Sequence, residues 1–66
     1  MSIKQITLKA ARTNKGLRQV DIANKLKVDR KTVSSWEQGK TMPNTKLIDP
    51  LCSLLGVDYN NIKWRQ

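Results

Sequence analysis

At 66 residues the chain has room for one domain, expected over residues 1–66, and its small core leaves little space for a deep enzyme pocket. Its 13 Lys and Arg against 5 Asp and Glu give a formal charge of +8, which indicates a polyanionic partner: nucleic acid first, an anionic membrane second. With no histidine, one cysteine, no paired carboxylates and no glycine-rich phosphate loop, the chain lacks the groups for enzyme chemistry, so we expect no enzyme, no metal and no cofactor.

The first two predicted elements are short helices. A helix over residues 7–14 is predicted to begin at the N-cap Thr7 and to stop before Gly16, which can adopt the left-handed conformation that closes a helix. A second helix is predicted over residues 19–26, where apolar residues recur every three or four positions. A short link, residues 27–28, joins it to the expected N-cap of the next helix, so the two helices are connected by a tight turn.

The third predicted helix covers about residues 30–38 and has two unlike faces. Asp29 is expected to cap it by accepting from the amide of residue 31 or 32, and Gly39 ends it. At about 100° per residue, its inner side holds Val33, Trp36 and Glu37. The other side holds Lys31, Ser34, Ser35 and Gln38, with Arg30 at the N-terminal end between the two sides. This spacing makes Trp36 a core residue rather than a platform for stacked bases.

A fourth segment opens at Pro43 and Asn44 and continues to Gly56 with apolar residues at helical spacing. Pro50 lies inside that pattern, so we expect either a kink or a helical start nearer Asp49.

A final turn around residues 59–62 is expected to return Tyr59, Ile62 and Trp64 to the core. No segment alternates with period two over the length of a strand. The predicted fold class is therefore all-α, a compact bundle of about five short helices.

The second and third segments match a helix-turn-helix, in which the second helix lies in the major groove of DNA. A polar face alone fits an ordinary solvated helix equally well. However, the pattern LKAAR…KGLRQVDIANKLKVDRKTVSSWEQGKTMP…LLGV resembles the phage-repressor and Cro-like (XRE-type, lambda-repressor-like) helix-turn-helix family over nearly the whole chain. The residues that carry the resemblance are Arg12, Gly16, Leu17, Gln19, Ala23, Val33, Trp36, Glu37, Gly39 and Pro43.

The resemblance implies a bundle of five short helices that binds a double-stranded DNA operator, usually as a homodimer. We expect a weak dimer without DNA, because a small patch gives little net affinity. The base-reading positions of the family fall on Arg30, Lys31, Ser34 and Ser35. The positions expected at the DNA backbone are Arg18, Gln19, Lys40, Thr41 and Asn44.

Arg12 and Glu37 each lie beside apolar residues on the inner face of a predicted helix. Lone charges there are costly unless they are paired. In the family the two corresponding residues form an ion pair, so the resemblance implies a structural Arg12–Glu37 pair that holds the third helix against the first.

The sequence departs from the family pattern at three places. Arg18 stands where Ser or Thr usually caps the second helix, which removes a cap worth about 1 kcal/mol and adds a cation near the DNA. Lys27 replaces the usual turn glycine, so either it is left-handed at a cost of about 1 kcal/mol or the turn differs. Asp49 and Pro50 replace apolar or helix-favouring residues in the fourth helix.

Two other classes of function stay open: a basic protein that binds RNA or other nucleic acid non-specifically, and a protein-interaction or antitoxin-type module. The first class predicts exposed aromatic residues or a long apolar moment.

No stretch approaches the roughly 20 apolar residues of a membrane span, and the N-terminus lacks the apolar core of a signal peptide. The lone Cys52 is expected to be a buried, inert core thiol. We therefore expect a cytoplasmic protein with no membrane and no small-molecule partner.

We expect no separate C-terminal domain, and the closing segment YNNIKW resembles the ends of short regulators from phages and mobile elements of Gram-positive bacteria. The expected role is therefore that of a Cro-like or small phage-type transcriptional repressor.

Overall fold

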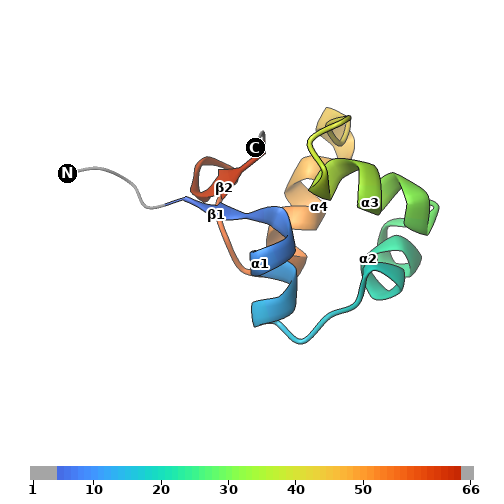
Figure 1. The fold of residues 1–66 in the computed structure, drawn as a ribbon, viewed down its shortest axis with the longest axis horizontal. Helices are drawn as coiled ribbons and strands as arrows, with labels where there is room; N and C mark the ends of the chain where they lie inside the picture. The colour runs from blue at the N-terminus through green and yellow to red at the C-terminus, as the bar shows by residue number, and fades with distance from the viewer. Residues whose placement is uncertain (1–4, 65–66) are drawn as a thin grey trace.

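A computed structural model describes residues 5–64, which form four α-helices (Figure 1). The expected fifth helix is a single 3₁₀ turn, η1, over Tyr59–Asn61, because the final strand begins at the very next residue, Ile62. The four helices are α1 (Leu8–Asn14), α2 (Gln19–Leu26), α3 (Arg30–Glu37) and α4 (Thr45–Leu55). The all-α class is therefore confirmed, with α3 ending one residue earlier than predicted.

All four helices close in the same way, with a residue in the left-handed conformation and a backbone hydrogen bond that spans five residues. After α1, for example, Gly16 has φ 72° and the N–H of Leu17 donates to the carbonyl of Arg12 at 3.2 Å. After α2 the left-handed residue is Lys27, with φ 58° and ψ 46°. The turn thus keeps its usual geometry, and a side chain accepts a conformation that favours glycine.

The N-terminal caps of the helices agree with the sequence prediction only in part. Thr7 caps α1, since its Oγ1 accepts from the N–H of Ala10 at 3.0 Å, and Asn44 Oδ1 caps α4 by accepting from Lys46 at 2.9 Å. Asp29 is the N-cap residue of α3, but its side chain makes no capping hydrogen bond, contrary to expectation. The backbone carbonyl of Asp29 still accepts the first bonds of the helix.

α4 begins at Thr45 and runs through Pro50, so a start near Asp49 is wrong. Pro50 is exposed, whereas Leu51 and Leu55 are buried and Leu47 packs against the core. Packing of that apolar stripe stabilises the helix across the proline, because most helix stability in proteins comes from tertiary contacts.

The core lies between the four helices and the C-terminal segment. Val33 and Trp36 of α3 are 1% and 3% exposed, so Trp36 packs in the core as predicted. The hydrophobic core cluster of the described chain consists of Leu8, Ala11, Ile22, Ala23, Val33, Trp36, Leu51, Leu55 and Ile62.

Two-residue strands, absent from the prediction, join the beginning of the described chain to its end. β1 (Ile6–Thr7) pairs in parallel with β2 (Ile62–Lys63), with Ile6 opposite Ile62. In Figure 1 these strands lie at one end of the molecule, and α2 and α3 lie at the other. The pair thus anchors the start of α1 far from the helix-turn-helix.

The expected return of the last residues to the core holds for only part of the segment. Ile62 is 1% exposed, but Tyr59 is 45% exposed, and Trp64 is half-buried with its ring centroid 5.5 Å from that of Tyr59. Trp64 Nε1 donates to the carbonyl of Tyr59 at 3.3 Å, which holds the two rings together at the surface. Over residues 5–64, no helix combines the length and apolar character needed to cross a membrane.

Candidate nucleic-acid interface

A buried ion pair joins α1 to α3. Arg12 Nε donates to Glu37 Oε2 at 2.6 Å, and Arg12 Nη2 donates to Glu37 Oε1 at 3.3 Å. Arg12 Nη1 donates to the carbonyl of Leu17 at 2.8 Å. Only 11% of the Arg12 side chain and 5% of the Glu37 side chain are exposed, so each charge compensates the other away from water. The pair therefore links α3 both to α1 and to the turn that follows α1.

Gln19, the first residue of α2, extends this network to the start of α3. Its Nε2 donates to Glu37 Oε1 at 3.0 Å, and its Oε1 accepts from Arg30 Nη1 at 3.1 Å. Because an ionised carboxylate can only accept, Glu37 orients the amide so that the oxygen faces Arg30. The amide thus fixes the position of the first side chain of α3.

This contact joins two side chains that were both predicted to touch DNA, Gln19 and Arg30, and those DNA contacts stay predictions. The sequence placed the first on the DNA backbone and the second on base edges, but in the free protein they bind each other. Gln19 keeps one N–H beyond the one given to Glu37, and Arg30 keeps most of its five donors. No helical spacing signals the contact, because it joins residues on two separate helices.

Arg18 is the N-cap residue of α2 and forms an exposed ion pair with Asp21. Its side chain makes no capping bond, since a guanidinium cannot accept one. Asp21 supplies half of a capping box instead, with Oδ2 accepting from the Arg18 backbone N–H at 2.7 Å. The expected loss of a cap is therefore offset, and an acidic residue three positions after the N-cap was the signal that could have predicted it.

The Arg18 guanidinium also contacts Asp21, through Nε to Oδ2 at 3.3 Å and Nη2 to Oδ1 at 3.2 Å. The hydrogen bond between the side chains, followed by their opposite charge, raises the pKa of Arg18. The same hydrogen bond, followed by the backbone N–H of Arg18, lowers the pKa of Asp21. With 78% of the Arg18 side chain exposed, the pair lies in water, beside the residue that binds Arg30.

The outer side of α3 contains all four predicted base-reading residues. Arg30 and Lys31 are exposed at its N-terminal end, while Ser34 and Ser35 are half-buried. Ser34 Oγ accepts from Gln38 Nε2 at 3.0 Å. The structure thus gathers two cations and two hydroxyl groups on one side of a helix whose other side, with Val33 and Trp36, is in the core.

The loop between α3 and α4 carries the remaining predicted contacts. Lys40 and Thr41 are exposed, and so is Met42, at 40%. Asn44 is exposed as well, but its Oδ1 is used as the cap of α4, which leaves the amide N–H groups as its donors.

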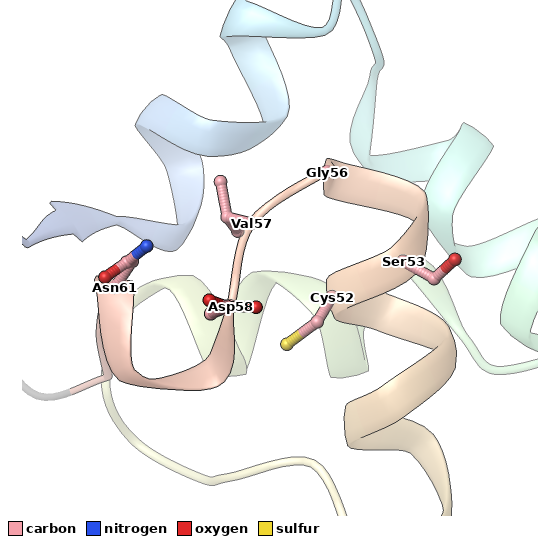
Figure 2. A pocket seen from close by; sticks show the side chains of 6 residues that line it. All are labelled: Cys52, Ser53, Gly56, Val57, Asp58 and Asn61. Atoms are coloured by element: carbon pink, nitrogen blue, oxygen red, sulfur yellow. The ribbon is translucent and has the colours of Figure 1, made fainter.

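A hollow of about 410 Å³ lies at the C-terminal end of α4 (Figure 2). Cys52 is half-buried there rather than buried as expected, and its sulfur points toward the 58–61 segment in Figure 2. Burial, and then the charges of Asp49 and Asp58, raises the pKa of the thiol. A thiol of raised pKa stays protonated at neutral pH and is a poor nucleophile. The lining residues are Cys52, Ser53, Gly56, Val57, Asp58 and Asn61.

The part of the chain from residue 5 to residue 64 contains no group of three or more His, Cys, Asp and Glu placed to hold a metal ion.

In a comparison with known protein families, a helix-turn-helix model aligns with residues 8–61. The matched range begins at the first residue of α1, includes α2, α3 and α4, and ends with η1. No curated protein matches the chain significantly.

Proposed function

The chain belongs to the XRE-type, lambda-repressor-like family of DNA-binding helix-turn-helix regulators, and on this premise we propose that it binds a specific double-stranded operator with α3 in the major groove. The observation that carries the proposal is the outer side of α3, where Arg30 and Lys31 project from a helix whose other side is fixed in the core. A rigid helix with cations at its N-terminal end matches the geometry by which such helices reach base edges.

In the proposed complex Arg30, Lys31, Ser34 and Ser35 face the bases. Arginine and lysine suit the O6 and N7 acceptors of guanine, and serine hydroxyls accept or donate to several bases. The residues proposed at the DNA backbone are Arg18, Gln19, Lys40, Thr41 and Asn44.

The experiment that tests this assignment compares two lysines. A preferred site is first selected from a random duplex pool, and Lys31→Ala and Lys40→Ala are then measured on that site and on random DNA across a salt series. Lys31→Ala should cost about 1 to 3 kcal/mol on the preferred site and much less on random DNA, because it removes a base contact. Lys40→Ala should weaken both alike and reduce the salt slope by about one unit, because it removes a phosphate contact.

Equal losses on both DNAs for Lys31→Ala would refute the groove-reading assignment. They would favour a basic face that binds nucleic acid by charge alone.

We further propose that two copies bind one operator, through the loop after α3 and the C-terminal segment. Met42 and Tyr59 are the exposed large hydrophobic residues of the described chain, and both lie in these segments. Footprints should show two half-sites whose centres are about 10 base pairs apart. A single protected half-site at saturating protein would contradict the homodimer.

The exposed Tyr59 also supports the alternative of an RNA-binding protein, because exposed aromatic rings stack on unpaired bases. Competition of single-stranded RNA against the selected duplex decides between the two. The regulatory outcome we propose is repression from an operator in the manner of Cro-like proteins, which a promoter–reporter assay with and without the protein measures.

A further inference from the structure

The Arg18–Asp21 pair combines two kinds of contact that differ in strength and in role. Asp21 Oδ2 accepts from the Arg18 backbone N–H at 2.7 Å, which caps α2. The contacts to the guanidinium are longer, at 3.2 and 3.3 Å, and lie in water. The exposed contacts can therefore break while the cap bond stays in place.

The pair also stands next to the proposed DNA-binding surface. Arg18 precedes Gln19, and the Gln19 amide binds Arg30 at the start of α3. A duplex that lies along α3 thus brings a phosphate close to the N-terminus of α2, where backbone N–H groups and the helix dipole already favour an anion.

We propose that Arg18 exchanges partners when DNA binds, leaving the Asp21 carboxylate for a backbone phosphate, so that Asp21 acts as a competitor that weakens binding to DNA of any sequence. This inference rests on the proposed function, whose site it deepens. In the free protein Asp21 cancels the charge of Arg18. In the complex Asp21 keeps only the backbone N–H and stands close to a phosphate of the same sign.

The competition has a use in a protein of charge +8. Non-specific binding comes almost entirely from cation–phosphate contacts, and a strongly basic chain is held on any DNA by them. Because Asp21 neutralises Arg18, it lowers the non-specific affinity for DNA, and the proposed base-reading residues are not affected. Asp21 thereby limits the time that the protein spends on DNA outside its operator.

The test is Asp21→Asn measured on a random-sequence duplex across a salt series. Asparagine keeps an oxygen that can accept the Arg18 backbone N–H, so the cap of α2 is retained, and the melting temperature of the variant checks the fold. Affinity should rise by about three- to tenfold, with a salt slope steeper by up to about one unit, because Arg18 no longer has to leave a carboxylate that stays charged beside the phosphate and retains a cation there. The matched control is Asp49→Asn, an exposed acidic residue on α4, which changes the net charge equally and should give a smaller gain with an unchanged slope.

A double-mutant cycle with Arg18→Gln distinguishes partner exchange by Arg18 from direct repulsion between the Asp21 charge and DNA. If Asp21 acts by holding Arg18, the gain from Asp21→Asn shrinks in the Arg18→Gln background. An equal gain in both backgrounds overturns the exchange, because Asp21 would then act only by its charge. A loss of affinity in Asp21→Asn also overturns it, because Asp21 would then align Arg18 for the phosphate.

The two proposals fail in different ways. If the unaltered protein binds neither random nor selected duplexes, the proposed function is wrong and the exchange falls with it. If it binds a selected site in a manner that depends on Lys31, while Asp21→Asn changes neither the affinity nor the salt slope, only the exchange is refuted.

Discussion

Two arginine–carboxylate pairs in this small protein use the same chemical groups in opposite surroundings. Arg12–Glu37 is 2.6 Å long with side chains 11% and 5% exposed, and Arg18–Asp21 is 3.2 Å long with side chains 78% and 32% exposed. The buried pair joins residues 25 positions apart on different helices, whereas the exposed pair joins residues three apart at one helix start. The pair that is distant in sequence is thus the buried one, and the pair that is close in sequence is the exposed one.

The difference teaches that burial decides what an ion pair can do. A buried charge that loses its partner cannot be compensated by water, so Arg12 and Glu37 must remain paired and can serve only to hold the fold. An exposed charge that loses its partner is solvated at little cost, so Arg18 can change partners. The same two groups therefore give rigidity beneath the proposed DNA-binding surface and adjustability at its edge.

Breaking the buried pair should have the largest effect. Glu37→Ala leaves the Arg12 guanidinium uncompensated and removes the acceptor for Gln19, which should destabilise the fold by about 3 kcal/mol. That is a large part of the stability expected of a chain this size, and the melting temperature should fall by more than about 10 °C. Thermal unfolding followed by circular dichroism measures it. An unchanged melting temperature would show that the pair is solvated and not structural.

A smaller loss is expected from Gln19→Ala, which leaves the ion pair intact but cuts its link to Arg30. Removing a hydrogen bond of this kind costs about 1 kcal/mol of stability, and Arg30 loses the acceptor that holds its Nη1. Binding to the selected operator should therefore weaken more than binding to random DNA. Gln38→Ala is the matched control for stability, because the Gln38 amide donates a solvent-exposed hydrogen bond to the hydroxyl of the half-buried Ser34. Equal stability losses in the two variants would show that the hydrogen bonds of Gln19 stabilise the fold no more than the exposed hydrogen bond of Gln38.

The smallest effect, and one that depends on pH, is expected from the exposed pair. Arg18 lowers the pKa of Asp21 below its unfolded value of about 3.9. A depressed carboxyl pKa stabilises the fold above the unfolded value, and this contribution disappears as pH falls through the folded value. The difference in melting temperature between the unaltered protein and Asp21→Asn should therefore be constant from neutral pH to about pH 5 and vanish in more acidic solution. A difference that does not depend on pH would mean that the carboxylate charge contributes nothing.

The helices were predictable because their signals are local. Thr7, the glycines and the three- or four-residue apolar spacing place α1, α2 and α3 within a residue of their observed ends. The two-residue strands were not predictable, since Ile6–Thr7 is too short to show alternation and its partner lies at the other end of the chain. Pro50 misled the prediction of α4, because a propensity rule gives way where Leu51 and Leu55 are buried.

The exposure of the candidate site residues on α3 was predictable, but their contacts were not. Helical spacing alone places Lys31 on a different side of α3 from Val33 and Trp36. In the structure Lys31 is exposed and the other two are buried. The bond between Gln19 and Arg30 depends on the angle and separation of two helices, which a pattern of residue types does not specify. The Arg18–Asp21 contact lies within one turn of helix, so the spacing of residue types could have revealed it.

The pairing of β1 with β2 has a consequence for the order in which the chain is completed during translation. The contacts between α2 and α3 join near neighbours in sequence and can form as soon as these helices emerge from the ribosome. Ile6 has no strand partner until Ile62 has been synthesised, and closing the chain over that separation costs loop entropy that the helix contacts do not. Until Ile62 is present, the backbone groups of Ile6 and Thr7 that pair with β2 stay unpaired, and unpaired strand edges are the sites where chains associate with one another.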